Sequence, residues 1–158
     1  MTRSGPGVRV RLNLPEGHML EQLLGDLQDS LEPGALDPAD PVRERLYPSG
    51  YEGAEDAAAF RELTEAGLQA DRSERVDACL AELLQARSIV RTDLLLGPEA
   101  ADRWIRVLND IRLALGTRLG VCEDDDMELD TAAPDVQDRA RYMWLTALQD
   151  LLVTTLMA

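Results

Sequence analysis

The sequence predicts a mainly α-helical fold with about five helices, a C-terminal antiparallel helical hairpin as its core and a small two-stranded β element. Apolar residues recur at helical spacing through most of the chain, most regularly in residues 98–120. Residues 8–14 instead alternate with a period of two. A chain of 158 residues can bury roughly two thirds of its unfolded surface in one core. We therefore expect residues 1–158 to form a single domain.

The predicted β element joins two short stretches that are far apart in the chain. Residues 8–14 place one apolar face on Val8, Val10, Leu12 and Leu14. A lone strand is not stable in water, so this strand needs a partner. Residues 88–96 are rich in β-branched and aliphatic side chains and stop at Gly97, which makes them the best candidate.

Residues 18–32 predict the first helix, because their leucines share one face and the stretch ends at Pro33. These leucines are Leu20, Leu23, Leu24, Leu27 and Leu31. His18, the only histidine, lies in the first turn. No second histidine or cysteine pair lies at ligand spacing from it. We interpret His18 as a partly exposed helix-start residue rather than a metal ligand or a catalytic base.

Residues 33–54 predict a connecting loop with room for one helical turn, because they are rich in proline, glycine and aspartate. The candidate partner-binding residues in this loop are Arg43, Arg45, Tyr47 and Tyr51. Two interpretations of the tyrosines remain open. Either they pack back onto the helices, which we favour, or they belong to a segment that docks on a partner.

Residues 55–85 predict a helical stretch in one or two pieces. In this stretch Cys79 shares a face with Val76, Leu80 and Leu83. A cysteine in an apolar setting behaves as a small buried hydrophobe, with a raised pKa and low reactivity. We therefore expect Cys79 to be buried and slow to react.

The last two predicted helices, residues 98–120 and 134–158, are expected to pack antiparallel with both tryptophans in the same core. The first has an apolar stripe made of Trp104, Leu108, Ile111 and Leu115, widened by Ile105 and Val107. The charged residues of this helix mostly fall on its other side, namely Arg103, Arg106, Asp110 and Arg112. Its end is marked by Gly116 and Gly120, although Gly116 is also compatible with a continuing helix. The second has a wide stripe made of Val136, Ala140, Met143, Trp144, Ala147, Leu148, Leu151 and Leu152.

Residues 121–134 predict an acidic, solvated loop between these helices. Alternate acids from Asp124 to Asp130 have the spacing of a calcium loop, but an EF-hand would need glycine at Leu129 and glutamate at Asp135. We therefore predict no metal site. The candidate partner contacts in this loop are Glu123, Asp124, Asp125 and Asp126.

The charge of the chain limits its partners. All 16 basic residues are arginine, and the formal net charge is −14. Proteins that bind nucleic acids carry a basic footprint, whereas this field would repel a duplex at long range. Promoter DNA would thus be reached through a protein partner, although solubility explains the same charge equally well. No stretch has the length and hydrophobicity of a membrane span or a secretory signal, so we expect a cytoplasmic protein that does not bind membranes.

The sequence contains no signature of an enzyme, because it lacks a phosphate-binding loop, a serine elbow and a histidine beside a cysteine. We expect no catalytic residue and no cofactor. Cys79 and Cys122 are the redox candidates, and in a reducing compartment they would normally be free thiols. The acids after Cys122 disfavour its thiolate. A disulfide between the two would stabilise the fold by roughly 4 kcal/mol if their Cα atoms approach within ~7 Å.

Four sequence blocks carry a family resemblance: RLYPSGY near residue 45, LNDIRLALGTRLG at residues 108–120, EDDD after Cys122 and WLTALQDLL near the C-terminus. Together they resemble an actinobacterial family catalogued as a domain of unknown function, whose characterised branch is the AosR-like redox-responsive transcription regulators. The resemblance covers almost the whole chain. It implies a cytoplasmic, non-enzymatic regulator that senses oxidants through cysteine disulfide chemistry. It also implies association with an alternative sigma factor and promotion of cysteine-biosynthesis and antioxidant genes.

Two classes of function follow from these observations. The first is an oxidative-stress-responsive transcription regulator that contacts a sigma factor or RNA polymerase, with gating by a cysteine disulfide as an option. The second is a non-redox interaction module or a proteolysis-linked adaptor. The sequence leaves a homodimer open in both cases.

Overall fold

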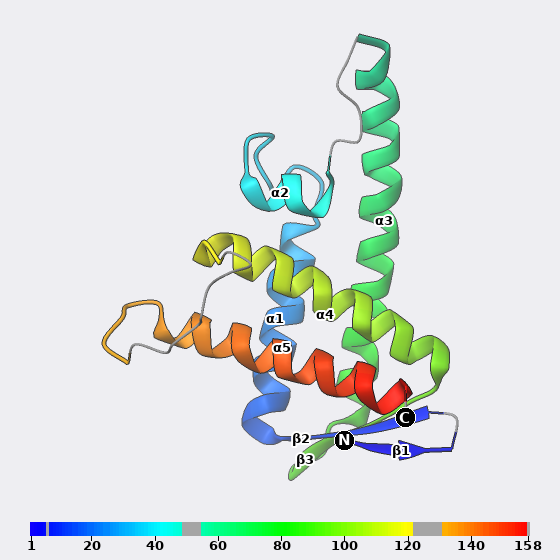
Figure 1. Cartoon of the computed structure of the whole chain (residues 1–158). Coiled ribbons are helices and arrows are strands. Elements are labelled where there is room, and N and C mark those ends of the chain that lie inside the picture. Colours follow the sequence, from blue (N-terminus) through cyan, green and yellow to red (C-terminus); the bar gives the residue numbers. More distant parts are fainter. Residues whose placement is uncertain (6, 49–54, 122–130, 158) are drawn as a thin grey trace.

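The computed structural model describes the chain apart from residues 6, 49–54, 122–130 and 158 (Figure 1). The described elements follow in the order β1 (Thr2–Ser4), β2 (Gly7–Asn13), α1 (Leu14–Ser30), α2 (Pro41–Leu46), α3 (Glu55–Ala86), β3 (Arg91–Leu96), α4 (Pro98–Leu119) and α5 (Val136–Met157). In Figure 1 the strands lie at the bottom of the view and the helices lie above them. This arrangement confirms the prediction of a mainly helical fold. None of the described helices is both long and apolar enough to cross a membrane.

The strands form one antiparallel sheet in the order β1-β2-β3. β2 pairs with β3 from Val8 opposite Leu96 to Asn13 opposite Arg91, which confirms the predicted pair. The prediction of two strands was one strand short, because β1 pairs with the start of β2. β1 could not be predicted from the sequence, because its three residues do not alternate between apolar and polar. The chain reverses after β1 at Gly5, whose φ of 61° lies in the left-handed region that glycine adopts without steric cost.

Gly7 and Gly25 provide a matched pair of substitutions that test the packing of the sheet. A Cβ on Gly7 would overlap the backbone oxygen of Leu96, whereas a Cβ on Gly25 meets nothing within 4 Å. We expect Gly7→Ala to lower the free energy of unfolding by about 1–3 kcal/mol. We expect Gly25→Ala, in the interior of α1, to raise it by up to about 1 kcal/mol. Urea unfolding followed by circular dichroism measures both, and a neutral Gly7→Ala would contradict the close approach of β2 and β3.

α1 begins earlier than the sequence predicts because a capping box sets its start. The Asn13 side chain accepts a hydrogen bond from the Glu16 N–H at 2.9 Å, and the Glu16 carboxylate accepts one from the Asn13 N–H at 2.8 Å. The predicted apolar face is confirmed, since Leu20, Leu23, Leu24, Leu27 and Leu31 are all buried. His18 is exposed on the opposite side.

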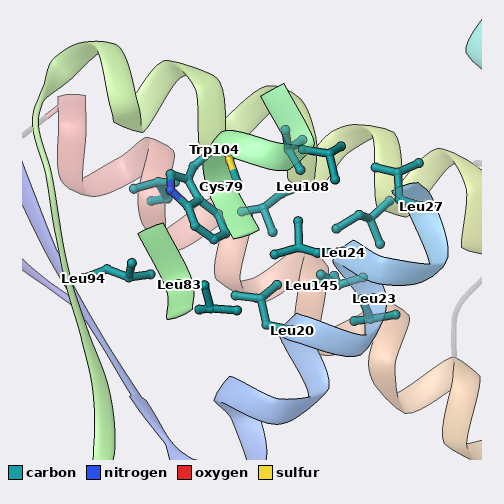
Figure 2. Packing of buried hydrophobic residues seen from close by; sticks show 14 of the residues in the cluster. Leu20, Leu23, Leu24, Leu27, Cys79, Leu83, Leu94, Trp104, Leu108 and Leu145 are labelled. Carbon is teal, nitrogen blue, oxygen red and sulfur yellow. The ribbon is translucent and has the colours of Figure 1, made fainter. Parts of the chain in front are cut away.

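One apolar core joins the sheet and the helices. The sheet contributes the inward side chains of β2 and β3, namely Val8, Val10, Leu12, Thr92, Leu94 and Leu96. Figure 2 shows Leu20 and Leu24 of α1 in the same core as Cys79 and Leu83 of α3 and Trp104 of α4. α3 runs through this region as one continuous helix, which selects the one-piece alternative for residues 55–85.

α4 and α5 lie side by side and run in opposite directions, as predicted (Figure 1). α4 continues through Gly116 and is capped by Gly120, whose φ is 65°. Trp104 of α4 is buried in the core. Trp144 of α5 is only partly buried against the core, where its Nε1 donates to Glu16 Oε1 at 3.4 Å. The prediction that both tryptophans share one core is therefore right for Trp104 and only partly right for Trp144.

The wide apolar stripe predicted on α5 is wrong in detail. Leu145, which the prediction left out, is fully buried together with Leu152. Met143, Ala147 and Leu151 are exposed. The reason is that α5 lies at the edge of the fold and buries a narrow face, so the apolar side chains beside that face stay in contact with solvent.

Candidate functional site

Cys79, the first redox candidate, lies at the centre of the core. Its side chain is 0% exposed, and Figure 2 shows it beside Trp104. Burial, together with a smaller effect of the Glu82 carboxylate, raises the pKa of the Cys79 thiol to about 12, while Arg103 acts in the opposite direction. The thiolate is the reactive form of cysteine, so Cys79 in the folded protein is a protonated thiol of low reactivity at neutral pH. The predicted burial of Cys79 is confirmed.

Cys122, the second redox candidate, lies outside the described residues. The same holds for Tyr51 and for the acidic candidates Glu123, Asp124, Asp125 and Asp126. A disulfide between Cys79 and Cys122 therefore stays a prediction, as does a role of the acidic stretch in partner binding.

The burial of Cys79 predicts a strong pH dependence of its labelling. In a Cys122→Ser variant at neutral pH, a thiol reagent should label native Cys79 roughly a thousandfold more slowly than the urea-unfolded chain, because the thiolate fraction falls tenfold for each unit by which the pKa rises. While the fold persists, the rate should increase about tenfold per pH unit, since the thiolate fraction keeps growing until pH approaches the pKa. Stopped-flow labelling measures both rates. Rapid native labelling that levels off near pH 8 would contradict the buried thiol.

The candidate partner-binding residues of the loop after α1 make contacts within the protein. Asp40 caps α2, because its side chain accepts from the Val42 N–H at 2.8 Å. Arg43 Nε donates to Glu65 Oε1 of α3 at 2.7 Å. Tyr47 is partly buried, which favours the packing interpretation for this tyrosine, whereas Arg45 is exposed. The pair of Arg43 and Glu65 links α2 to α3, while α2 packs chiefly against α4. A role of Arg43, Arg45 and Tyr47 in partner binding stays a prediction.

Asp110 was not among the predicted site residues, and its burial differs from the prediction. The prediction assigned it to the polar side of α4, yet it is only 5% exposed. Its Oδ2 lies 3.4 Å from Nε of Arg72 on α3, and the Arg72 guanidinium lies 5.4 Å from the centre of the Tyr47 ring. Burial raises the pKa of the Asp110 carboxyl, while Arg72, Arg75 and Arg106 oppose this effect. Asp110, Arg72 and Tyr47 form one ionic and aromatic cluster that links α2, α3 and α4.

An open cavity of about 470 Å³ lies next to this cluster. Polar side chains from α1, α2 and α3 contribute to its wall, among them Ser30, Arg43, Glu65 and Gln69. The Gln69 side chain donates to the backbone oxygen of Leu31, and Arg43 pairs with Glu65. Within the part of the chain that the structure describes, no group of three histidine, cysteine, aspartate or glutamate side chains could hold a metal ion.

Fold and site together define a small, acidic, mainly helical protein with a buried cysteine at the centre of its core. The chain belongs to the family described as "Domain of unknown function (DUF2017)", which matches residues 1–156. The resemblance indicated by the four sequence blocks is thereby confirmed.

Relatives of the chain are named for oxidative stress. A Mycobacterium bovis protein named "Oxidative stress regulator AosR" is 29% identical over an alignment of 195 residues, which covers 99% of this chain and 85% of that protein. A Mycobacterium tuberculosis protein of the same name shows the same identity and coverage. A Mycobacterium leprae protein, which carries the AosR name provisionally, is 32% identical over 152 residues, or 91% of this chain and 60% of that protein. No solved structure matches the chain significantly.

Proposed function

We propose that this protein is an oxidative-stress-responsive transcription regulator that acts through contacts with other proteins and not through catalysis. The observation that carries the proposal is the similarity to relatives named oxidative stress regulator over 99% of the chain. A net charge of −14 supports action through a protein partner, because it opposes unaided binding to a phosphate backbone. The proposed partner is a sigma factor or RNA polymerase in the cytoplasm, which would bring the regulator to promoter DNA.

The proposal includes gating by a disulfide between Cys79 and Cys122. Hydrogen peroxide would oxidise the two thiols to one disulfide and would itself be reduced to two molecules of water. Because Cys79 is buried and protonated, Cys122 would react first: its thiolate would attack one oxygen of peroxide to form a sulfenic acid, and the other oxygen would take up a proton and leave as water. Cys79 would then displace the hydroxyl group from the sulfenic acid of Cys122 after α3 opens locally.

Pull-down with purified RNA polymerase and sigma factors, before and after peroxide treatment, tests this function. Wild-type protein should lose two free thiols on oxidation, migrate faster on a non-reducing gel and change its retention of the partner. Cys122→Ser and Cys79→Ser should each abolish the shift in migration. Thiols that stay reduced at peroxide concentrations that alter cells would contradict the gating. If neither RNA polymerase nor a sigma factor retained the protein in either redox state, the proposed partner would be wrong.

The burial of Cys79 favours a second candidate, an interaction module or proteolysis-linked adaptor without a redox role. Such a module would bind its partner equally well with and without peroxide. Retention by protease components instead of sigma factors would identify an adaptor. Titration of the pure protein with promoter DNA over a salt series adds a further check, because tight sequence-selective binding would overturn the argument from charge.

A further inference from the structure

The outward face of the sheet carries a cluster of arginines on an otherwise acidic protein. Arg9 and Arg11 of β2 and Arg91 of β3 all surround Asp93, at nitrogen-to-oxygen distances of 3.5, 3.6 and 3.6 Å respectively. The three guanidinium groups and the single carboxylate sum to a formal charge of +2, whereas the whole chain carries −14. We name Arg9, Arg11, Arg91 and Asp93 the arginine face.

The register of the sheet explains how the arginine face forms. Arg11 lies directly opposite Asp93, while Arg9 and Arg91 occupy neighbouring positions on the same side. The alternate residues of both strands point into the core, so no side chain of the arginine face contributes to apolar burial. The side chains of Arg9, Arg11 and Arg91 are 37, 56 and 54% exposed. The described helices lie on the opposite side of the sheet (Figure 1).

Exposed aliphatic side chains border the arginine face. Leu95 lies opposite Arg9 on the outward side of β3. Ile89, which is 93% exposed, and Val90 precede the other end of β3. Single exposed aliphatic residues need no explanation, but these three flank a concentration of positive charge. A ligand that covers the face would meet guanidinium groups in the middle and hydrocarbon at the ends.

We propose that the arginine face is the docking surface for a protein segment that presents carboxylates flanked by aliphatic side chains. A guanidinium fork binds carboxylates bidentately, and each arginine here has more donors than Asp93 can accept. Asp93 holds the three arginines together in the unbound protein and shares them with the incoming carboxylates. The bordering aliphatic residues favour such a segment over a nucleic acid, because a phosphate backbone has no hydrocarbon side chains that could cover them. The inference goes beyond the proposed function, because it holds for a partner of any cellular role.

Fluorescence anisotropy with a labelled peptide of alternating glutamate and valine tests the docking surface. The full-length protein should bind this peptide, bind a matched glutamine–valine peptide far more weakly and lose affinity as salt is added. Replacing Arg9, Arg11 and Arg91 with glutamine should weaken binding by about tenfold or more. Asp93→Asn should tighten binding several-fold, because it removes the internal competitor and leaves the three arginines in place.

The matched control replaces Arg106, Arg118 and Arg141 with glutamine, which changes the net charge equally at exposed or partly exposed positions away from the sheet. The control should retain the affinity of the wild type, and circular dichroism should show the same helical content for all variants. Equal losses in the two triple variants, no binding of the peptide by the wild type, or tighter binding of a DNA duplex through the same arginines would each overturn the proposal. The pull-down with RNA polymerase measures a different property, so either proposal can fail while the other stands.

Discussion

Trp104→Ala is expected to lower the free energy of unfolding by about 3–5 kcal/mol, which is a large part of the stability of a domain of this size. The indole is among the largest fully buried side chains and packs beside Cys79 (Figure 2). Its Nε1 donates to Glu82 Oε2 at 2.7 Å, and Glu82 also pairs with Arg103. Because Arg103 still pairs with Glu82 in the variant, most of the loss comes from the cavity that the indole leaves. Urea unfolding followed by circular dichroism measures it.

Two further substitutions separate packing from hydrogen bonding at this position. Trp104→Phe keeps an aromatic ring but removes the donor to Glu82, so we expect a smaller loss of about 1–2 kcal/mol. Trp144→Ala removes the other tryptophan, which is only partly buried, and should cost less than Trp104→Ala. Native Cys79 should also become faster to label in Trp104→Ala, because the cavity lies next to its sulfur. A loss in Trp104→Ala no larger than that in Trp144→Ala would show that Trp104 is not central to the core.

The features of the fold that the sequence predicts well depend on short-range patterns. The alternation of Val8, Val10 and Leu12 indicates β2 by itself, because a period of two places all three side chains on one face. The spacing of the leucines of α1 likewise puts them on one side of the helix, whichever elements that side packs against. The same reasoning predicted a buried Cys79, since its neighbours at helical spacing are apolar.

The features that the sequence misses are set by residues far away in the chain. Leu145 is buried in place of Met143 because α4 decides which side of α5 is covered. Asp110 is buried because Arg72 on α3 can reach it across the helix interface. The arginine face likewise requires the register of β2 against β3, since Arg9 and Arg11 meet Arg91 and Asp93 only in the folded sheet.

The pair formed by Arg72 and Asp110 is expected to show strong energetic coupling. Arg72→Met leaves a buried carboxyl without its nearest cation, and Asp110→Leu leaves a largely buried guanidinium without its carboxylate. Each single variant should lose about 3 kcal/mol, because an uncompensated buried charge is more costly than an intact pair. The double variant should recover most of this loss, since two apolar side chains of similar volume can pack where the ions were. A double-mutant cycle measured by urea unfolding gives the coupling free energy.

The pH dependence of these variants follows from the pKa of Asp110. Burial raises the pKa of its carboxyl in the folded state above its value of about 3.9 in the unfolded state. The stability that the protonated carboxyl contributes is therefore present in full below pH 3.9 and is lost as pH rises through the folded-state pKa. Removing Arg72 takes away a cation that lowers this pKa, so the deficit of Arg72→Met should grow between about pH 4 and neutrality.

Two controls distinguish this coupling from a general loss of packing. Arg72 also lies over the ring of Tyr47, so up to about 1 kcal/mol of cation–π interaction should stay lost in the double variant. Tyr47→Leu isolates that contribution, because it removes the ring and leaves the pair of Arg72 and Asp110 in place. The double variant should have lost the part of the pH dependence that Asp110 causes, since it contains no carboxyl at this position. Additive losses in the cycle, or a deficit of Arg72→Met that is constant from pH 4 to 7, would show that the two side chains contribute to stability independently.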